Sequence, residues 1–417
     1  MKALAYDAVV IGAGPAGLAA AHAAANSGAS VAIVDDNPGS GGQIWRGGAA
    51  ASQDKRARSL AQHIADAKNI SLHLQTRVVH IAAAGELLAQ TADAAINLRY
   101  RKLILATGAR ERLLPFPGWT LPGVMGAGGL QALSKGGFPV VGKNIVVAGS
   151  GPLLLAVAAS LAERGARVSH ILEQATPVRL LRFLLSLPAT PGKLLQALQL
   201  RRQLQGTRYL GNSYVQAAHG DVRLQQVTVS IGGKQQDLPC DYLACGYGLL
   251  PNTELASAAG CRLQDGKVVV DEWQRTSVAG VYCAGEGTGI GGVDLALAEG
   301  YIAGYAASGQ TPQAEQFFRQ RRKWQAFAQR LEKSFALRAE LLSLCRPDTL
   351  VCRCEDVSYA QLLRHTGWRS AKLHTRCGMG SCQGRICGAA TELLFGWEKD
   401  EARLPIFPAR VESLLSE

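Results

Sequence analysis

The chain has 417 residues, of which 47% are hydrophobic and 18% are charged, so it is long enough for two or three globular domains. Its net charge of +12 is densest in RQRRK at residues 319–323, on a predicted helix that no nucleic-acid-binding motif accompanies. We therefore expect no nucleic-acid partner. The basic run is typical of a solvated helix face, and a docking surface for an acidic protein or anionic lipid stays open as the alternative.

Apolar segments such as AGLAAAHAAA do not reach the roughly 18 to 20 residues that cross a bilayer. The first motif begins at Gly12, which leaves no room before it for a signal peptide. We therefore expect a cytoplasmic location. In that compartment, ten cysteines indicate metal ligands or free thiols rather than disulfides.

The N-terminal region reads as a strand, a glycine-rich turn, a helix and a second strand. The strands are AVVIG at residues 8–12 and SVAIVDD at residues 30–36. In a dinucleotide site of this kind Gly12 makes the turn, Gly14 lets a pyrophosphate approach the backbone, and Gly17 lets the helix pack closely on the strand. The spacing and its context predict a dinucleotide-binding site.

The helix after this turn begins with Pro15 and Ala16, and its N-terminus offers amide donors and a partial positive charge to the phosphates. Asp35, with Asp36 as the second choice, is expected to bind a ribose hydroxyl of the cofactor. The motif alone does not separate FAD from NAD.

Three later stretches favour FAD because they resemble pyridine-nucleotide-disulfide-reductase-like flavoproteins. PGSGGQIWRG at residues 38–47 resembles the segment along the flavin, KLILATGAR at 102–110 resembles the return loop, and SVAGVYCAGEGTG at 277–289 resembles the ribityl-binding segment. In the last, Glu286 stands where the family usually has aspartate. The resemblance implies an α/β fold with two dinucleotide-binding domains over about residues 5–310. It also implies FAD contacts from Gly42, Gln43, Val78, Ala106, Thr107, Gly108, Gly285, Glu286 and Val293.

A second strand–turn–helix unit starts at NIVVAGSGPLLL, where Gly149 and Gly151 match the first two glycines and Leu154 occupies the third position. A leucine there either pushes the helix from the strand or demands local repacking. Glu173 follows at the distance of a ribose-binding acid. The unit is either an NAD(P) site or a retained fold with weak or altered binding, and Leu154 favours the second interpretation.

After this unit, two short amphipathic helices broken at Pro188 and Pro191 are rich in leucine and arginine. Such helices usually cover a core, and a contact with a membrane or with another subunit stays open.

The sequence has no redox-active cysteine pair where disulfide reductases of this fold carry one. We expect four scattered cysteines to be small buried hydrophobic residues, namely Cys240, Cys245, Cys261 and Cys283. No residue is identified as a catalytic acid or base. The flavin is therefore expected to exchange electrons with a carrier rather than with a substrate thiol.

Five cysteines lie close together near the C-terminus, in VCRCED at residues 351–356 and HTRCGMGSCQGRICG at residues 374–388. Four thiolates suit a [2Fe–2S] cluster, and nearby glycine amides and arginines would stabilise its negative charge. Zinc also takes four thiolates, but structural zinc sites usually use CxxC pairs, which this chain lacks. The thiols favour the cluster, with zinc or free thiols as the alternatives.

The motifs CRCE and GMGxCQGxxC resemble those of the bacterioferritin-associated-ferredoxin-like [2Fe–2S] domain. The combined architecture resembles the α subunits of heteromeric FAD- and [2Fe–2S]-containing amino-acid dehydrogenases, a group with members in opine oxidase, hydrogen cyanide synthase and D-hydroxyproline dehydrogenase. The resemblance implies metal ligation by Cys352, Cys354, Cys382 and Cys387 and leaves Cys377 outside the set. A rival set uses Cys377 together with Cys382.

The resemblance implies a multi-subunit enzyme in which a partner of the D-amino-acid-oxidase type oxidises an amino acid or secondary amine. An opine, D-hydroxyproline or glycine is the expected kind of substrate. This chain would relay electrons to a quinone or nicotinamide, either in the cytoplasm or at the inner face of the membrane, and a small ferredoxin-like protein stays open as a further partner. A stand-alone NAD(P)H-dependent reductase and a non-enzymatic iron–sulfur module are the alternatives.

The predicted domains are residues 1–115 and 247–310 for FAD binding and 116–246 for an inserted NAD(P)-binding-like domain. They are followed by 311–346 for a linker helix and 347–417 for the [2Fe–2S] domain and tail.

Overall fold

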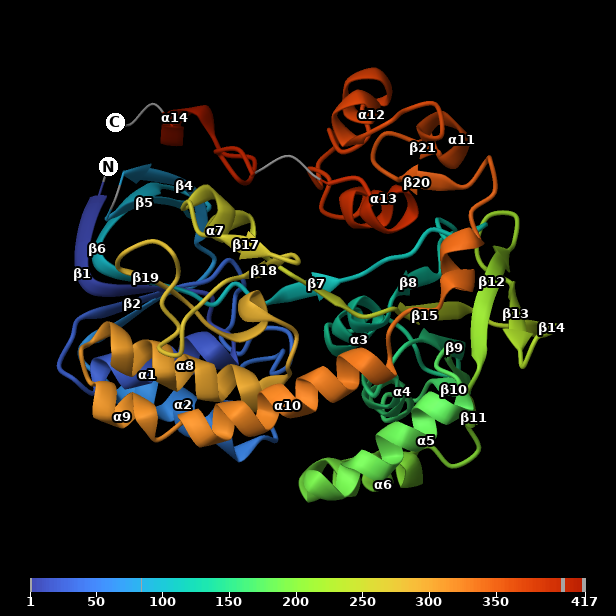
Figure 1. Cartoon of the computed structure of the whole chain (residues 1–417), viewed down its shortest axis with the longest axis horizontal. Helices are drawn as coiled ribbons and strands as arrows, with labels where there is room; N and C mark the ends of the chain where they lie inside the picture. The colour runs from blue at the N-terminus through green and yellow to red at the C-terminus, as the bar shows by residue number, and fades with distance from the viewer. Residues whose placement is uncertain (1, 84, 399–401, 415–417) are drawn as a thin grey trace. The chain divides into compact units, whose positions relative to one another are not determined.

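The structure is a computed structural model that describes residues 2–83, 85–398 and 402–414 (Figure 1). It divides into two compact units. Unit 1 comprises Met1–Arg110, Leu250–Ala328 and Glu401–Glu417, and unit 2 comprises Glu111–Leu249 and Gln329–Asp400. Each unit contains one dinucleotide-binding type of sheet. The predicted fold with two such domains is confirmed.

Unit 1 is built on a seven-stranded sheet in which β3, β2, β1, β6, β5 and β4 follow one another and β19 pairs with β6. Pairing is parallel from β3 to β6 and at β19, and antiparallel from β6 to β4. The strands are Lys2–Ile11 (β1), Val31–Val34 (β2), Ile70–His73 (β3), Arg77–Ala83 (β4), Glu86–Gln90 (β5), Ala95–Leu105 (β6) and Val281–Cys283 (β19). The central parts of these parallel strands are buried apolar runs, AVVI in β1, VAIV in β2 and LIL in β6, as expected where both faces of a sheet are covered.

Helices α1 (Pro15–Ala25) and α8 (Val293–Ala307) pack against each other in unit 1 because their contact face consists of small residues. A Cβ on Gly300 would lie 2.3 Å from the Ala16 carbonyl oxygen, and one on Gly304 would lie 2.2 Å from that of Ala20. No side chain larger than hydrogen fits at either position. This close approach places the start of α8 near the first glycine-rich turn.

The remaining elements of unit 1 are short apart from α2 (Lys55–Asp66). They are α7 (Glu254–Ala258), β17 (Leu263–Gln264), β18 (Lys267–Val268), η2 (Gly285–Thr288), α9 (Thr311–Glu315) and α14 (Val411–Leu414). The chain passes between the units at β7 (Ala109–Glu111), β16 (Leu249–Pro251) and α10 (Phe318–Ser334).

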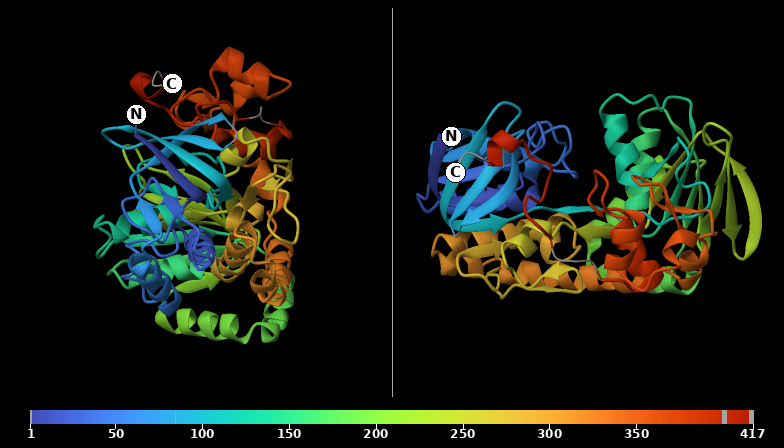
Figure 2. Two further views of the ribbon diagram at one scale, coloured as in Figure 1. Left: turned by 90° about the vertical axis from the view of Figure 1, so that its left-hand side faces the viewer. Right: turned by 90° about the horizontal axis from the view of Figure 1, so that it is seen from above.

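The inserted part of unit 2 has a parallel sheet in the order β11, β10, β9, β15 and β8 (Figures 1 and 2). Its strands are Val124–Gly126 (β8), Asn144–Gly149 (β9), Arg167–Glu173 (β10), Arg208–Leu210 (β11) and Tyr242–Gly246 (β15). The helices are Ala127–Lys135 (α3), Leu153–Ala162 (α4), Pro177–Ser186 (α5) and Pro191–Gln203 (α6), with the 3-10 turn Leu187–Ala189 (η1) between the last two. An antiparallel sheet comprises Ser213–His219 (β12), Gln226–Ile231 (β13) and Lys234–Pro239 (β14).

The C-terminal cysteine module, which we define as residues 347–398, also belongs to unit 2 and has its own small core around Trp368. After η3 (Ala339–Ser343) it contains β20 (Leu350–Cys352), β21 (Val357–Ser358), α11 (Tyr359–Leu362), α12 (Trp368–Thr375) and α13 (Cys387–Phe395). Trp119 of the inserted part donates a hydrogen bond of 2.6 Å to the Leu350 carbonyl.

The division of the chain differs from the predicted domains in two places. The predicted linker helix 311–346 consists of α9, α10 and η3, and it is shared between the two units. The tail after the cysteine module groups with unit 1, because Ile406 is buried in the unit 1 core and its amide donates to the Val79 carbonyl at 3.0 Å. Within the described ranges, no helix combines the length and the apolar character needed to cross a membrane.

Candidate cofactor sites

The first glycine-rich turn lies where β1 and β6 end and α1 begins. Gly12 has φ +107, and a Cβ there would lie 2.2 Å from the Ala106 carbonyl oxygen. A Cβ on Gly17 would lie 1.8 Å from the Gly12 carbonyl oxygen, and one on Gly285 would lie 2.8 Å from the Ala16 Cβ. The structure therefore brings the predicted residues of three separate segments into direct contact.

Gly14 and Gly42 face each other across this turn. A Cβ on Gly42 would lie 3.0 Å from the Gly14 Cα, and the Gly41 amide donates to the Ala13 carbonyl at 2.7 Å. Two backbone stretches without side chains therefore meet beside the α1 N-terminus, the kind of surface that a pyrophosphate approaches. Gln43 is exposed, and its side-chain oxygen accepts from Arg46. The residues present fit a dinucleotide.

The two candidate ribose acids have different environments. Asp35 is 9% exposed, and its carboxylate accepts from the amides of Ala13 at 2.6 Å and Asn37 at 2.8 Å. Asp36 is exposed and pairs with Arg77 at 3.3 Å. Asp35 thus connects the end of β2 to the glycine-rich turn. The next residue of β4, Val78, is buried in the unit 1 core.

The return loop at Thr107 and Gly108 is held by residues that the sequence did not single out. The Thr107 hydroxyl donates to the Asn252 carbonyl at 2.6 Å, and the Asn252 amide group donates back to the Thr107 carbonyl at 3.0 Å. Arg110 donates to the Asn252 side chain at 2.8 Å and pairs with Glu254 at 2.9 Å. These contacts define the conformation of the loop before any ligand binds.

Glu286 lies beside the N-terminus of α8, where Val293 is the first helical residue. Its carboxylate accepts from the amides of Gly292 at 2.9 Å and Gly291 at 3.2 Å, and burial raises its pKa. The longer glutamate side chain reaches the unpaired amides of the helix start, which are satisfied in this way.

A second buried carboxylate, Glu299, holds the same loop from the middle of α8. It is 2% exposed and accepts from the Gly285 amide at 2.9 Å and the Thr288 hydroxyl at 2.8 Å. Burial raises its pKa to about 7, against the opposing effects of these hydrogen bonds and of Arg321. The sequence prediction missed Glu299, although an acid inside an apolar helix was a usable signal.

We expect Glu299→Gln to remove a pH dependence of stability. Glutamate has an ordinary pKa of 4.5 and a folded-state pKa of about 7 here, so the folded state binds the proton more tightly. The stabilisation from that proton is full below pH 4.5 and is lost as pH rises through 7, a loss of about 3 kcal/mol. Denaturant unfolding of the wild type and of Glu299→Gln at about pH 5 and about pH 8 measures this loss of unfolding free energy. An equal loss between the two pH values in both proteins would contradict the assignment to Glu299.

The second glycine-rich turn accommodates Leu154 by repacking, which is one of the two outcomes that its position predicted. Leu154 is fully buried in the core of the inserted sheet. A Cβ on Gly246 would lie 3.0 Å from the Leu154 Cδ2 and 3.1 Å from the Ala127 Cβ, so the leucine fills the space beside a glycine. The helix α4 therefore remains packed on its sheet.

The chain itself covers this second turn with residues 335–338, which follow α10. The Ser150 hydroxyl donates to the Phe335 carbonyl at 2.8 Å, and Gln174 donates to the Ala336 carbonyl at 3.1 Å. The Arg338 amide donates back to the Gln174 side chain at 3.1 Å. A Cβ on Gly151 would lie only 3.6 Å from the Phe335 ring, so this ring covers the backbone that a pyrophosphate would approach.

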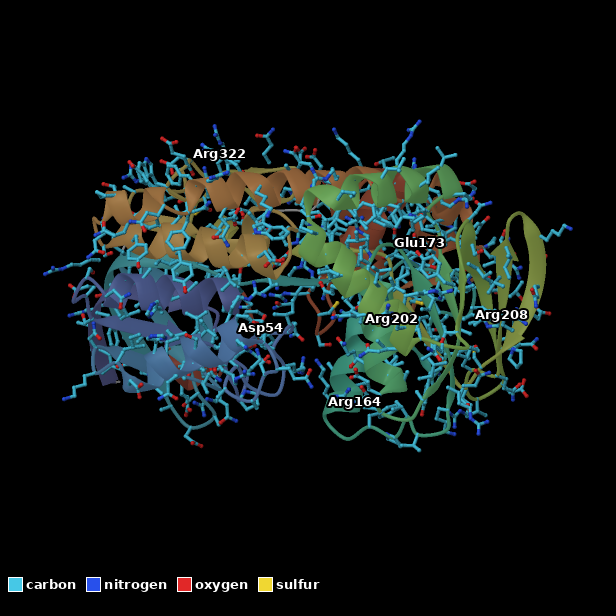
Figure 3. All side chains as sticks on the ribbon, turned by 90° about the horizontal axis from the view of Figure 1, so that it is seen from below. Asp54, Arg164, Glu173, Arg202, Arg208 and Arg322 are labelled. Carbon is cyan, nitrogen blue, oxygen red and sulfur yellow. The ribbon has the colours of Figure 1, made fainter. Side chains whose placement is uncertain are left out.

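Glu173, labelled in Figure 3, is also hydrogen-bonded within the chain. It is fully buried, and its two carboxylate oxygens accept from the amides of Gly151 at 2.6 Å and Ala175 at 2.9 Å. Burial raises its pKa to about 7. The acid that would meet an adenine ribose is thus bonded to the backbone of its own turn.

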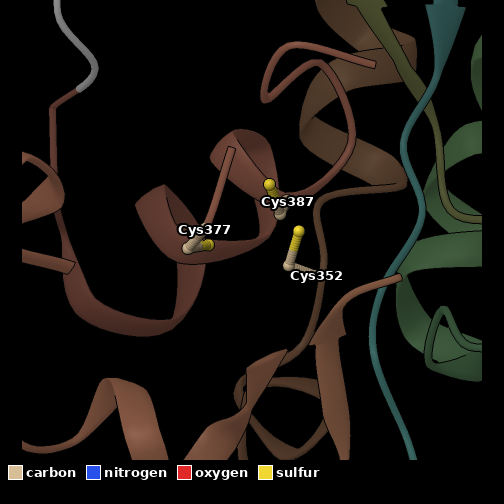
Figure 4. Close-up of side chains that lie close together, drawn as sticks. All are labelled: Cys352, Cys377 and Cys387. Carbon is tan, nitrogen blue, oxygen red and sulfur yellow. The ribbon is translucent and has the colours of Figure 1, made fainter. Parts of the chain in front are cut away.

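The cysteine module brings all five C-terminal cysteines together. The sulfur atoms of Cys352, Cys377 and Cys387 lie within 4.8 Å of one another, and all three residues are buried (Figure 4). Cys354 is exposed and Cys382 is half-buried. A cavity of about 320 Å³ is lined by Leu113, Cys352, Arg353, Cys354, Cys382, Ile386 and Cys387. The four predicted ligands thus line one cavity, and Cys377, which does not line it, has its sulfur within 4.8 Å of those of Cys352 and Cys387.

Hydrogen bonds among the thiols divide them into donors and acceptors. Donation from Cys377 and Cys387 lowers the pKa of Cys352 to about 2, and donation from Cys387 lowers that of Cys382 to about 5. The pKa of Cys377 is raised to about 12 by its contact with Cys352. The same contacts raise the pKa of Cys387, so the lowered values concern Cys352 and Cys382. An iron–sulfur cluster and a zinc ion both require deprotonated sulfur, so these contacts do not distinguish the two.

The loop around these thiols depends on two glycines. A Cβ on Gly378 would lie 2.6 Å from the Trp368 ring, and one on Gly384 would lie 3.0 Å from it. Gly378 has φ +83 and Gly384 has φ +75, a region that favours glycine. The indole therefore holds both parts of the CGMGSCQG loop in contact, which positions the cysteines between them.

The other cysteines behave as the sequence predicts. Four are less than 7% exposed, namely Cys240, Cys245, Cys261 and Cys283, and burial raises the pKa of each thiol. All ten cysteines, which lie within the described ranges, are free thiols. The prediction of small buried hydrophobic residues is confirmed.

Comparison with known proteins agrees with this architecture. The family model of the pyridine nucleotide-disulphide oxidoreductases matches residues 6–301. The opine oxidase A chain of Agrobacterium tumefaciens is 34% identical, covering 98% of this chain and 91% of that protein. Hydrogen cyanide synthase subunit HcnB of Pseudomonas aeruginosa is 32% identical, covering 91% of this chain and 90% of that protein.

Among solved structures, L-proline dehydrogenase from P. horikoshii has a TM-score of 0.71 at 20% identity, over 99% of this chain and 80% of that one, which shows a common fold. The first turn, with its FAD-type surroundings, and the sequence relationship lead to the same conclusion. The chain is an oxidoreductase of the pyridine nucleotide-disulphide oxidoreductase family, in the group that contains the opine oxidase relative and hydrogen cyanide synthase subunit HcnB.

Proposed function

We propose that this chain is the FAD- and [2Fe–2S]-containing electron-transfer subunit of a multi-subunit dehydrogenase for an amino acid or secondary amine. A D-amino-acid-oxidase-like partner oxidises the substrate, and this chain relays the electrons to an acceptor. FAD exchanges one or two electrons and a [2Fe–2S] cluster exchanges one, so the pair converts a two-electron oxidation into single-electron steps. The names of the relatives, which are subunits of an opine oxidase and a hydrogen cyanide synthase, support the heteromer and the substrate class.

One observation carries this proposal. The chain has the fold of a disulphide oxidoreductase, yet its ten cysteines form no disulfide, and four of them line one cavity in the cysteine module, with Cys377 close to two of these four. A thiol pair beside the flavin is what this fold uses to reduce a disulfide substrate. With that pair missing and a thiol-lined cavity present, one-electron transfer is the chemistry that the residues suit best.

In this proposal the residues Gly12 to Gly17, Asp35, Gly42 and the Glu286 loop hold FAD, and four cysteines hold the cluster. The hydrogen bonds of Glu299 and Asn252 keep the flavin loops in place. The cysteine ligands are Cys352, Cys354, Cys382 and Cys387, which line the cavity together.

The second candidate, a stand-alone NAD(P)H-dependent reductase, is disfavoured by the 335–338 segment. This segment occupies the surface of the second turn, and Ser150, Gln174 and Glu173 are already bonded to the chain's own backbone. A nicotinamide dinucleotide would have to displace these contacts, each of which contributes about 1 kcal/mol. We infer that electrons do not enter from NAD(P)H.

We expect NADH to bleach the flavin of the isolated chain slowly and without saturation. In stopped-flow experiments, mixing the chain with its D-amino-acid-oxidase-like partner and the partner's amine substrate should instead reduce the flavin rapidly. The double variant Ser150→Ala, Gln174→Ala loses two hydrogen bonds that hold the 335–338 segment on the second turn. It serves as the comparison in which a nucleotide has better access to that turn.

Fast, saturable bleaching by low NADH in the unmodified chain would overturn the relay proposal in favour of the reductase. Failure of both NADH and the partner's substrate to reduce the flavin would leave the third alternative, a non-enzymatic iron–sulfur module, as the better interpretation.

A further inference from the structure

Helices α5 and α6 of unit 2 present apolar side chains to solvent. Leu185 is 73% exposed, Leu195 is 61% exposed and Leu181 is 59% exposed. The other exposed members are Val178, Leu184 and Leu198. Single exposed hydrophobic residues are common on protein surfaces, but six aliphatic residues in two neighbouring helices form a patch. Such a patch indicates a surface that binds another molecule.

The exposed face of each helix lies opposite the face that packs on unit 2. In α5, Phe183 is buried, and its ring meets the Phe335 ring edge-on with 5.0 Å between centroids. After α6, Leu204 is buried in the core of the inserted sheet. At 100° per residue, Leu181 and Leu185 point away from Phe183, as Leu195 and Leu198 point away from Leu204. The exposed leucines are therefore not required for packing within the chain.

The charge of this segment is entirely positive. No aspartate or glutamate lies between Glu173 and Asp221, whereas Arg179, Arg182, Lys193, Arg201 and Arg202 lie within the two helices. Arg182, Arg201 and Arg202 are exposed, and Figure 3 looks onto the helices with Arg202 labelled. Cations beside exposed leucines complement a surface that is apolar within and anionic at its rim.

The composition separates a lipid surface from a protein partner. Protein interfaces depend on aromatic anchors, whereas leucine and valine are under-represented among the residues that dominate their binding energy. Every large exposed apolar residue here is leucine or valine, and the one aromatic residue, Phe183, faces inward. Short cationic leucine-rich helices are suited to lie in the plane of a bilayer containing anionic lipid.

We propose that α5, η1 and α6 form a membrane-surface anchor, which places leucines between the headgroups and arginines against anionic phosphates of the bilayer. The inference concerns a surface of unit 2 and does not rest on the electron-transfer function. It would bring the chain to a membrane through helices that lie in the plane of the bilayer surface.

The test is flotation of the full chain, with its cofactors, on vesicles of phosphatidylcholine with or without about 30% phosphatidylglycerol. The wild type should float with the anionic vesicles, remain below the neutral ones, and release as salt is raised. Leu181→Glu combined with Leu185→Glu should reduce binding about tenfold or more, because charge replaces the inserted side chains. Arg182→Gln combined with Arg202→Gln should weaken binding and reduce its salt dependence.

Val222→Glu is the matched control, since Val222 is 83% exposed in unit 2 outside these helices and should bind like the wild type. Unchanged thermal unfolding would show that the exposed substitutions leave the fold intact. Three results would overturn the proposal: no flotation of the wild type, equal flotation of the leucine variant, or loss of flotation only with Arg322→Gln in the α10 basic run. A dimer that the leucine variant dissociates would instead assign the face to a second copy of the chain.

Discussion

Cys382→Ala should abolish the visible absorption and the electron paramagnetic resonance signal of the [2Fe–2S] cluster that we propose, while Cys377→Ala should leave both in place. Cys382 lines the cavity with three further predicted ligands, whereas Cys377 does not line it. A cluster that loses one of four thiolates loses a bond that no neighbouring group replaces in kind. Iron and sulfide should fall to near zero per chain in the Cys382 variant.

Cys377 is the informative comparison because the sequence motif leaves it outside the ligand set, whereas the structure places it beside two of the predicted ligands. Its sulfur lies within 4.8 Å of those of Cys352 and Cys387, and it is fully buried. Replacement by alanine leaves only a small cavity, so the fold should survive. If Cys377→Ala and Cys382→Ala both lose the cluster while Cys387→Ala keeps it, the ligand set is the rival one, and a cluster that survives Cys382→Ala would contradict both sets. Stoichiometric zinc without iron in the wild type would exclude a cluster altogether.

Gly17→Ala is expected to abolish FAD binding and to destabilise unit 1 strongly. The added Cβ would lie 1.8 Å from the Gly12 carbonyl oxygen, and neither backbone segment moves without separating α1 from β1. Overpacking of a rigid core costs about 1 to 3 kcal/mol even when side chains can adjust, and here the clash is with backbone. Flavin absorbance per chain after purification and the midpoint of thermal unfolding measure the two effects.

Gly39→Ala is the matched control for this substitution. It changes a glycine of the same FAD-type region, but a Cβ there meets no atom within 4 Å. FAD content and unfolding midpoint should both stay at wild-type values. Full flavin content in the Gly17 variant would mean that the first turn does not hold the cofactor, and the FAD assignment would have to move elsewhere.

Much of the first site follows from local sequence, because its parts are neighbours in the chain. The strand, the glycines at 12, 14 and 17, the helix and Asp35 form one continuous unit, and the structure has it as predicted. The burial of the four single cysteines was also predicted, because an isolated cysteine in a strand or turn usually behaves as a small hydrophobic residue.

What the sequence left undecided concerned contacts between distant segments. Glu299 reads as one acid in an alanine-rich helix, and only the packing of α8 reveals that it holds the Gly285 loop. The competing interpretations of the second turn could not be separated, because the outcome depends on a segment more than 180 positions after Ser150. The tail was assigned to the cysteine module because it follows it, yet Ile406 fills the unit 1 core.

By itself, the sequence determined the dinucleotide-binding turns, the absence of a redox-active cysteine pair beside the flavin and the grouping of five thiols near the C-terminus. The turns and the thiol group each depend on residues within about 35 positions of one another, so a local stretch of sequence is enough to recognise them. The tertiary structure decided that Leu154 is accommodated beside Gly246, that residues 335–338 cover the second turn, and that Cys377 lies beside Cys352 and Cys387 without lining the cavity. Each of these features depends on contacts between segments that are far apart in the sequence. Close packing determines such contacts only when the whole chain is folded.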